Sequence, residues 1–249
     1  MKHSLKNLIG YSIETNDGME GKIKDFLFDE DNWAVRYLEA DFGGFFNDKR
    51  VILPVDVIIN PNWENNQILL NTSKEKIGLS PAPAEIPTIS REYEQKLYEH
   101  YGYPMYWGAG YVPPLPSGAY FPARPLNVPK NKQISEKAMN SSLRSFKDVE
   151  GYNIRATDDT LGHVEDLIVD DADWQLVYLI VDTSNWLPWS KKVMLAVDWM
   201  KEISYANREV KINLTTDTIK DAPDYDSDQP IEMSYEHELS EYYQRNRLM

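Results

Sequence analysis

Residues 10–57 read GYSIETNDGMEGKIKDFLFDEDNWAVRYLEADFGGFFNDKRVILPVDV, and a closely related stretch returns at residues 151–197. Ten positions of the first copy carry the same residue type 141 residues later: Gly10, Ile13, Asp17, Gly21, Asp25, Asp29, Trp33, Tyr37, Leu38 and Asp41. A match of this extent at a constant offset indicates an internal duplication, and its period is too long for a solenoid. We therefore expect two tandem copies of one small domain.

The duplication continues beyond these stretches. The register shifts by one residue after Asp41, because one copy has a one-residue insertion in a loop, and from Val51 onward the offset is 142. It then holds into the tail that follows each copy, at Ile77, Pro81, Tyr93, Leu97 and Tyr101. We expect a first domain over residues 1–101, a linker over 102–139 and a second domain over 140–249, since 249 residues suit one or two domains.

Composition excludes several classes of function. The net charge is −14, and residues 140–249 hold 11 Lys and Arg against 22 Asp and Glu, which disfavours direct nucleic-acid binding. The chain has no cysteine, so it contains no disulfide, thiolate metal site or cysteine nucleophile. No apolar run reaches the length of a signal peptide or a membrane span, so a cytoplasmic location is expected.

Apolar and aromatic runs separated by short polar turns predict β-strands. In the first copy they cover residues 21–29, 34–42, 51–55 and 67–71, and in the second their counterparts cover 162–170, 175–183, 193–197 and 209–214. A mainly β fold with short helices follows, in which each copy forms a small closed or partly open barrel, because closure removes exposed strand edges.

Helical segments are expected after each barrel. Ser73 and Thr215 are predicted N-caps of short helices that end before a proline. Residues 88–101 and 234–243 have helical spacing and carry a Tyr-Leu-Tyr stripe at every fourth position. We expect the stripe to pack on its own barrel, with partner binding as the alternative. Between the domains lies a stretch rich in proline and aromatic residues, typical of an extended linker.

No catalytic residue, cofactor site or metal site is predicted, because familiar nucleophile, phosphate-binding and zinc motifs are absent. Asp25 and Asp166 interrupt apolar strands. We interpret them as acceptors of backbone N–H bonds at a turn or bulge, while the alternative makes them an acid/base pair. The acidic turns around Asp29 and Asp170 are at best weak cation sites, since they lack the glycine and terminal glutamate of calcium loops.

Two loops carry large apolar residues where hairpin tips are expected, and such residues are costly to leave in water. They are the candidate partner-binding residues Phe45, Phe46, Trp186, Leu187 and Trp189. The alternative is that they fold back to close a barrel end or bury against the other barrel.

The repeated residues resemble the PRC-barrel family, which includes the photosynthetic reaction-centre H subunit and ribosome maturation factors. The resemblance rests on LIGY at 8–11, GKIKDFLFD at 21–29 and WAVRYL at 33–38, and in the second copy on VEGY at 149–152, GHVEDLIVD at 162–170, VYLIVD at 177–182, WLP at 186–188 and KV at 192–193. It implies a non-catalytic module. The chain shows no membrane helix of the H-subunit kind and no preceding domain of the ribosome-factor kind, so it is most similar to soluble bacterial tandem-barrel proteins.

The expected function is therefore that of a non-catalytic interaction or scaffold protein. The resemblance also implies a stress-related role as one form of this function. It would bind a protein partner or associate with itself, a homo-oligomer being one form of such binding, without nucleic acid or a membrane span. Two alternatives are an accessory factor of a reaction-centre-like complex and a metal-assisted hydrolase that uses the barrel aspartates.

Overall fold

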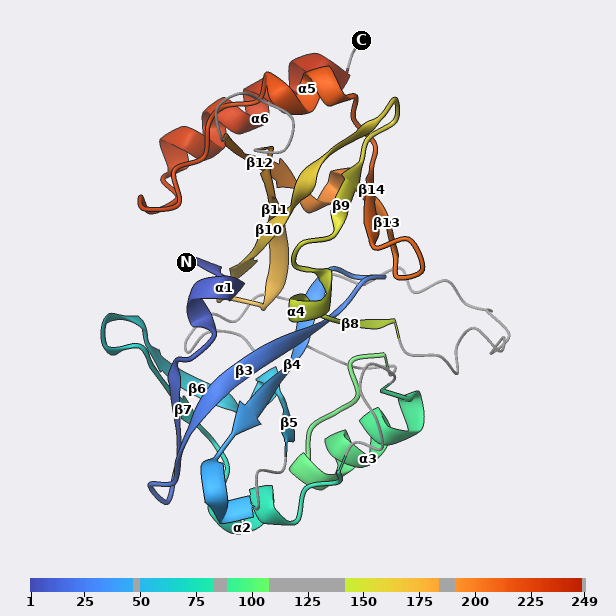
Figure 1. The fold of residues 1–249 in the computed structure, drawn as a ribbon. Helices are drawn as coiled ribbons and strands as arrows, with labels where there is room; N and C mark the ends of the chain where they lie inside the picture. Colours follow the sequence, from blue (N-terminus) through green and yellow to red (C-terminus); the bar gives the residue numbers. More distant parts are fainter. Residues whose placement is uncertain (47–49, 83–88, 108–141, 184–190, 248–249) are drawn as a thin grey trace. The chain divides into compact units, whose positions relative to one another are not determined.

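The computed structural model describes residues 1–46, 50–82, 89–107, 142–183 and 191–247, and these residues form two compact units. The first unit comprises Asn7–Ser145 with Ala172–Trp174. The second unit comprises Met1–Lys6, Phe146–Asp171 and Gln175–Met249. Figure 1 shows strands and short helices in both, which confirms the predicted mainly β fold.

The two units repeat one sheet topology. In the first unit the strand order is β6-β7-β2-β3-β4-β5, and in the second it is β13-β14-β9-β10-β11-β12. Neighbours are antiparallel except β2 with β7 and β9 with β14, which are parallel. No pairing closes β5 onto β6 or β12 onto β13 among the described strands, so each barrel is open along that seam. The bounds are β2 Ser12–Thr15, β3 Glu20–Asp29, β4 Ala34–Asp41, β5 Val51–Pro54, β6 Ile58–Asn62, β7 Gln67–Leu70, β9 Asn153–Arg155, β10 Thr160–Asp170, β11 Gln175–Asp182, β12 Lys192–Ala196, β13 Met200–Ser204 and β14 Glu209–Ile212.

The strands predicted from sequence are confirmed to within one or two residues, whereas β6 and β13 were not expected. Their residues include Asn60, Pro61 and Asn62, or Lys201 and Glu202, which read as a polar connection. Backbone pairing with β7 and β14 forms these strands despite their low intrinsic preference for a sheet.

Each unit takes one short strand from the other repeat. Strand β1 (Lys2–Ser4) pairs with β10 in the second unit, and strand β8 (Leu143–Ser145) pairs with β3 in the first. Helix α1 (Leu5–Leu8) starts in the second unit and ends in the first, and helix α4 (Phe146–Val149) follows β8. The first strands of the two repeats are therefore exchanged between the units.

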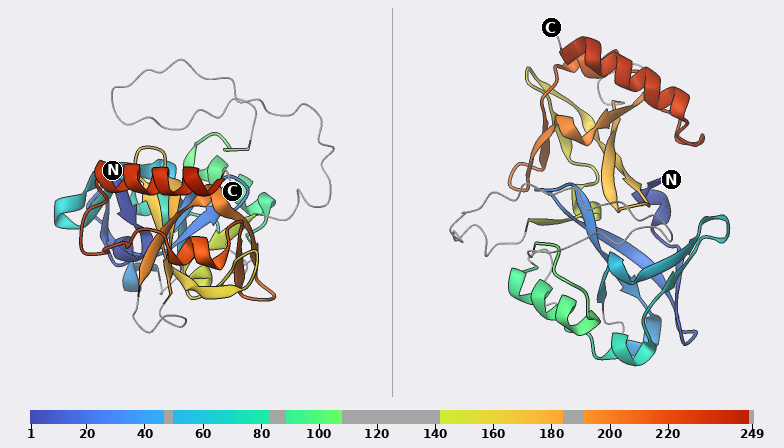
Figure 2. Two further views of the ribbon diagram at one scale, coloured as in Figure 1. Left: turned by 90° about the horizontal axis from the view of Figure 1, so that it is seen from above. Right: turned by 180° about the vertical axis from the view of Figure 1, so that it is seen from behind.

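The predicted helices are present, and their caps are the predicted ones. Ser73 caps α2 (Lys74–Gly78) by accepting a hydrogen bond from the Lys76 backbone, and Thr215 caps α5 (Thr216–Lys220) in the same way from Thr218. Longer helices trail each sheet, α3 (Arg91–Tyr101) in the first unit and α6 (Met233–Arg247) in the second, and both lie across the strands of their own unit (Figures 1 and 2). Short 3₁₀ helices occupy Gly43–Phe46, Val55–Val57, Trp63–Asn65 and Val197–Trp199.

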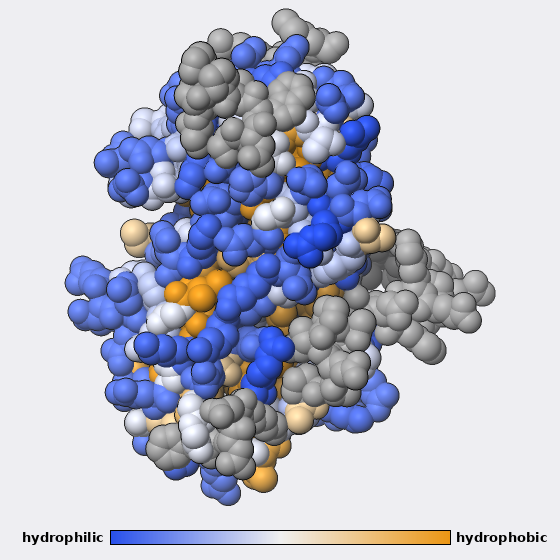
Figure 3. Space-filling view, in the orientation of Figure 1, coloured by the Kyte–Doolittle hydropathy of each residue, from blue (hydrophilic) through white to orange (hydrophobic). Residues whose placement is uncertain are grey.

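The trailing helix of each unit adds buried residues to the core that the strands form. Leu97 and Tyr101 of α3 are buried, as are Leu239 and Tyr243 of α6, which confirms that the stripe packs on its own sheet. The Tyr243 hydroxyl donates to the backbone oxygen of Met194 on β12 at 3.0 Å. The face shown in Figure 3 is mostly hydrophilic, as the high charge of the chain requires.

Candidate binding groove under the C-terminal helix

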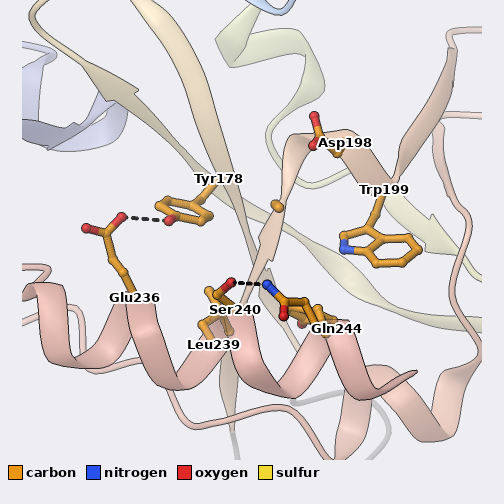
Figure 4. Close-up of a pocket in the computed structure, with 9 residues that line it drawn as sticks. Tyr178, Asp198, Trp199, Glu236, Leu239, Ser240 and Gln244 are labelled. Atoms are coloured by element: carbon orange, nitrogen blue, oxygen red, sulfur yellow. Dashed lines mark hydrogen bonds between the residues drawn. The ribbon is translucent and has the colours of Figure 1, made fainter. Parts of the chain in front are cut away.

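A groove lies between helix α6 and the strands of the second unit. Its volume is about 210 Å³, and it is lined by Tyr178, Ala196, Asp198, Trp199, Glu236, Leu239, Ser240, Tyr243 and Gln244. Figure 4 shows Tyr178 and Trp199 on opposite sides of it, above Ser240 of the helix. Ser240, Gln244 and Asp198 are exposed, so solvent reaches the groove. The lining combines aromatic walls with two carboxylates, a composition that suits a ligand with an apolar body and a hydrogen-bond donor.

A tyrosine–glutamate pair holds one end of the groove. The Tyr178 hydroxyl on β11 donates to Glu236 Oε1 on α6 at 2.6 Å, and burial together with the nearby Glu236 carboxylate raises the Tyr178 pKa. Lys2 Nζ lies 2.9 Å from the same Glu236 oxygen and balances its charge. Since Lys2 belongs to β1, the exchanged strand completes this end of the site.

The first unit contains the same pair. The residues equivalent to Tyr178 and Glu236 are Tyr37 and Glu94, and the Tyr37 hydroxyl donates to Glu94 Oε2 at 2.8 Å. Here both side chains are fully buried, with exposed fractions of 0%. Burial raises the Tyr37 pKa well above its ordinary value. The duplicated scaffold is thus the same in both units, but the first unit covers the pair completely.

Tyr98 of α3 provides that cover. Its ring lies 5.9 Å from the Tyr37 ring in an edge-on arrangement, and its hydroxyl donates to Asp56 Oδ2 at 3.3 Å. The residue equivalent to Tyr98 in the second unit is Ser240, while Asp56 is matched by Asp198. The groove therefore lies where the Tyr98 ring lies in the first unit.

A second aromatic layer covers Tyr98. Tyr106 and Trp107, which follow α3, lie with their ring centroids 6.0 and 5.8 Å from that of Tyr98, and the Tyr106 hydroxyl donates to Glu94 at 2.9 Å. The Arg36 and Arg91 guanidinium groups lie 4.2 and 5.2 Å from the centre of the Tyr106 ring, within the range of cation–π attraction.

The second unit lacks both cations of this layer. Val177 stands where the first unit has Arg36, and Met233 stands where it has Arg91. Met233 is 85% exposed, an unusual state for a large apolar side chain. Two positions that are cationic in the first unit are therefore apolar in the second.

A comparison with known families gives the chain its classification. The model of the PRC-barrel domain matches residues 2–77 and 143–219. The chain belongs to the PRC-barrel family. Each match begins at an exchanged strand and ends within α2 or α5. The trailing helices α3 and α6 lie outside the matched regions, so the groove joins a PRC domain to an element beyond it.

No curated protein matches the chain. Within the described part of the chain, no helix has both the length and the apolar composition needed to cross a membrane.

The aspartates inside the PRC strands accept backbone hydrogen bonds. Asp25 Oδ1 accepts from the Phe26 N–H at 2.8 Å and Asp166 Oδ1 from the Leu167 N–H at 2.7 Å, each beside a shift in the strand register. The exchanged strands complete both sites, since Ser145 donates to Asp25 and Ser4 to Asp166. Burial raises the pKa of the Asp166 carboxyl to about 6. The backbone hydrogen bonds expected for these two aspartates beside a bulge are therefore present.

Three side chains in the second unit could share a cation: His163, Glu165 and Asp182, whose ligand atoms lie within 4.8 Å of one another. Glu165 already accepts from Lys192 at 3.0 Å and Lys6 at 3.3 Å, so a metal ion would have to displace two ammonium groups. In the first unit the equivalent residues are Lys22, Lys24 and Asp41, and Lys24 pairs with Asp41 at 3.0 Å. In each set one carboxylate is therefore already paired with lysine.

The predicted partner-binding loops fall largely outside the described residues. Trp186, Leu187 and Trp189 belong to residues 184–190, which the structure does not describe. The backbone of Phe45 and Phe46 forms part of the 3₁₀ helix Gly43–Phe46, but their side chains are not described. Their role stays a prediction. The groove itself was not predicted, although the replacement of Tyr98 by Ser240, next to a stripe that matches in both helices, was a visible signal.

Proposed function

We propose that this PRC-barrel protein is a non-catalytic interaction module that binds a partner protein through the groove between α6 and the 3₁₀ helix Val197–Trp199. One observation carries the proposal. The same place in the first unit is filled by the chain's own aromatic residues, Tyr98 with Tyr106 and Trp107 above it, whereas Ser240 leaves it open in the second. In the first unit the protein fills this space with its own side chains. In the second unit the space is open, and we infer that another chain fills it.

The chemistry of the groove supports binding more than catalysis. Its polar groups are a tyrosine that donates to a glutamate, an exposed aspartate and a serine, with no nucleophile beside a base. Aromatic walls around an open space are typical of an anchor site in protein recognition. The hydrolase alternative would need the PRC aspartates, which accept bonds from backbone and serine. No described contact favours a reaction-centre accessory role, and a cytoplasmic location remains a prediction of the sequence.

Site-specific photocrosslinking in the natural host tests the proposal. A photoreactive benzoylphenylalanine in place of Gln244, which lines the groove, should give an adduct with a partner protein. The same group in place of the exposed Glu202 on β13 is the matched control and should not give that adduct. The adduct should disappear when Ser240→Tyr fills the groove. The same adduct from both positions, or its persistence in Ser240→Tyr, would contradict the proposal.

A further inference from the structure

We infer that the groove binds the side chain of a tyrosine of the partner chain, with its ring against Tyr178 and its hydroxyl on Asp198. The inference rests on the proposed function and adds the identity of the anchoring group. The first unit shows what the bound state would look like. There Tyr98 occupies the equivalent place and donates to Asp56.

The acceptor is retained where its donor is lost. Asp198 stands at the position of Asp56, yet among the described residues its carboxylate accepts no hydrogen bond and forms no ion pair, whereas Asp56 accepts from Tyr98. Asp198 is exposed and Asp56 is buried, as expected if the covering ring is present in only one unit. A carboxylate accepts and cannot donate, so the matching group of the ligand is a donor such as a phenol hydroxyl.

The space fits one aromatic ring. A cavity of about 150 Å³ is enough to hold benzene in other proteins, and the groove measures about 210 Å³. Tyr178 stands at the position of Tyr37, whose ring packs edge-on with that of Tyr98, so an aromatic ring of the ligand has an aromatic neighbour here. Leu239 and Ala196 supply apolar contacts at the bottom.

The rim favours a ligand carried on a protein chain. In the first unit the segment that covers Tyr98 contributes Tyr106 and Trp107, and the cations Arg36 and Arg91 hold it. In the second unit Val177 and the exposed Met233 stand at the positions of those cations, and these two apolar side chains would suit apolar neighbours of the bound tyrosine. Residues 140–249 also carry a net negative charge, with 22 acidic against 11 basic residues, which favours a partner segment without acidic residues.

The test is an NMR titration of the full-length protein with the tripeptide acetyl-Gly-Tyr-Gly-amide. Shift changes should be confined to the amides of Ser240 and Gln244 and to the Trp199 indole. The Phe tripeptide, which lacks only the hydroxyl, should bind at least about tenfold more weakly, because it cannot donate a hydrogen bond to the charged Asp198 carboxylate. Asp198→Ala should remove that difference, and Ser240→Tyr should abolish binding of both peptides.

Two controls keep the test decisive. Glu238→Tyr adds a ring to an exposed position of α6 that does not line the groove, and this variant should bind like the wild type. It separates filling of the groove from disturbance of the helix. p-Cresol represents a free phenol. Equal binding of the Tyr and Phe peptides, binding of p-cresol without the Tyr peptide, or no shift with any probe would each overturn the tyrosine inference. The photocrosslinking adduct at Gln244 decides the proposed function separately.

Discussion

The two trailing helices place different side chains over the same position of their sheets. In the first unit, Tyr98 of α3 closes the space between Tyr37 and Asp56 and is 1% exposed. In the second unit, Ser240 of α6 leaves that space open between Tyr178 and Asp198. The tyrosine, glutamate and aspartate around the space are present in both units. The Tyr98 ring therefore distinguishes a filled core from an open groove, together with the exchange of Val57 for Trp199.

The difference shows how a duplicated fold divides its tasks. In the first unit the polar groups are satisfied internally, so they contribute to stability. In the second, Tyr178 and Glu236 still pair with each other, whereas the Asp198 carboxylate is exposed to solvent. Substitutions that exchange or remove the features that distinguish the two units should therefore affect them differently.

The largest effect is expected from Tyr98→Ser, which gives the first unit the residue of the second. Truncation of a buried aromatic side chain costs about 3–5 kcal/mol, and here the Asp56 hydrogen bond and the support for Tyr106 are also lost. Urea unfolding should show this loss, and hydrogen exchange should locate it in the first unit. Ser240→Ala is the control and should leave stability unchanged. A loss below about 1 kcal/mol would mean that Tyr98 does not complete this core.

The next effect concerns Asp166, where β1 meets the second unit. Burial places its pKa at about 6 against an ordinary value of 3.8, so the folded state holds a proton that the unfolded state has released. The free energy of unfolding of the second unit should therefore fall by about 3 kcal/mol as the pH rises from about 4 to 6. The reason is that a pKa shift of one unit corresponds to about 1.4 kcal/mol. Asp166→Asn should remove this dependence in urea unfolding followed across pH. The exposed Asp198→Asn should preserve it, and a slope unaltered by Asp166→Asn would refute the assignment.

A smaller difference in stability loss is expected between substitution of the buried Glu94 and substitution of its partly exposed counterpart Glu236. Glu94→Gln weakens the acceptor for Tyr37, Tyr106 and Arg91, and should cost about 2 kcal/mol, the range for hydrogen bonds to a charged group. Glu236→Gln should cost less than about 1 kcal/mol, because its pair with Lys2 is partly exposed. Chemical denaturation of both variants measures the difference. Equal losses would show that burial of the first pair adds nothing.

The smallest stability change is expected from Ser240→Tyr, which gives the second unit the residue of the first. A ring packed on Tyr178 with its hydroxyl on Asp198 should raise the stability of the second unit by about 0.5–1 kcal/mol. Thermal unfolding provides the measurement, with Ser240→Phe as the variant that lacks the hydroxyl and should gain less. A clear loss of stability in Ser240→Tyr would mean that Trp199, in place of Val57, already occupies part of the space.

Much of the fold was predictable because its signals are local. Strand alternation, the Ser73 and Thr215 caps and the stripe on each trailing helix depend on neighbouring residues, and all were found where the sequence placed them. The groove was not predictable in this way. Its walls come from β11, from the 3₁₀ helix after β12 and from α6, and in the first unit Tyr98 reaches Asp56 across 42 residues. The residues that the two repeats share define the scaffold, whereas the groove depends on a position at which the repeats differ, Tyr98 against Ser240.

The sequence by itself determined that one mainly β domain occurs twice, with a helix after each copy, since pattern and capping act over a few residues. Only the tertiary structure decided which copy of the first strand joins which sheet. Ser4 and Ser145 occupy equivalent positions, and each donates to the strand aspartate of the unit that it joins. Because the two strands offer the same hydrogen bond, local chemistry does not distinguish between them, and the path of the whole chain makes the choice.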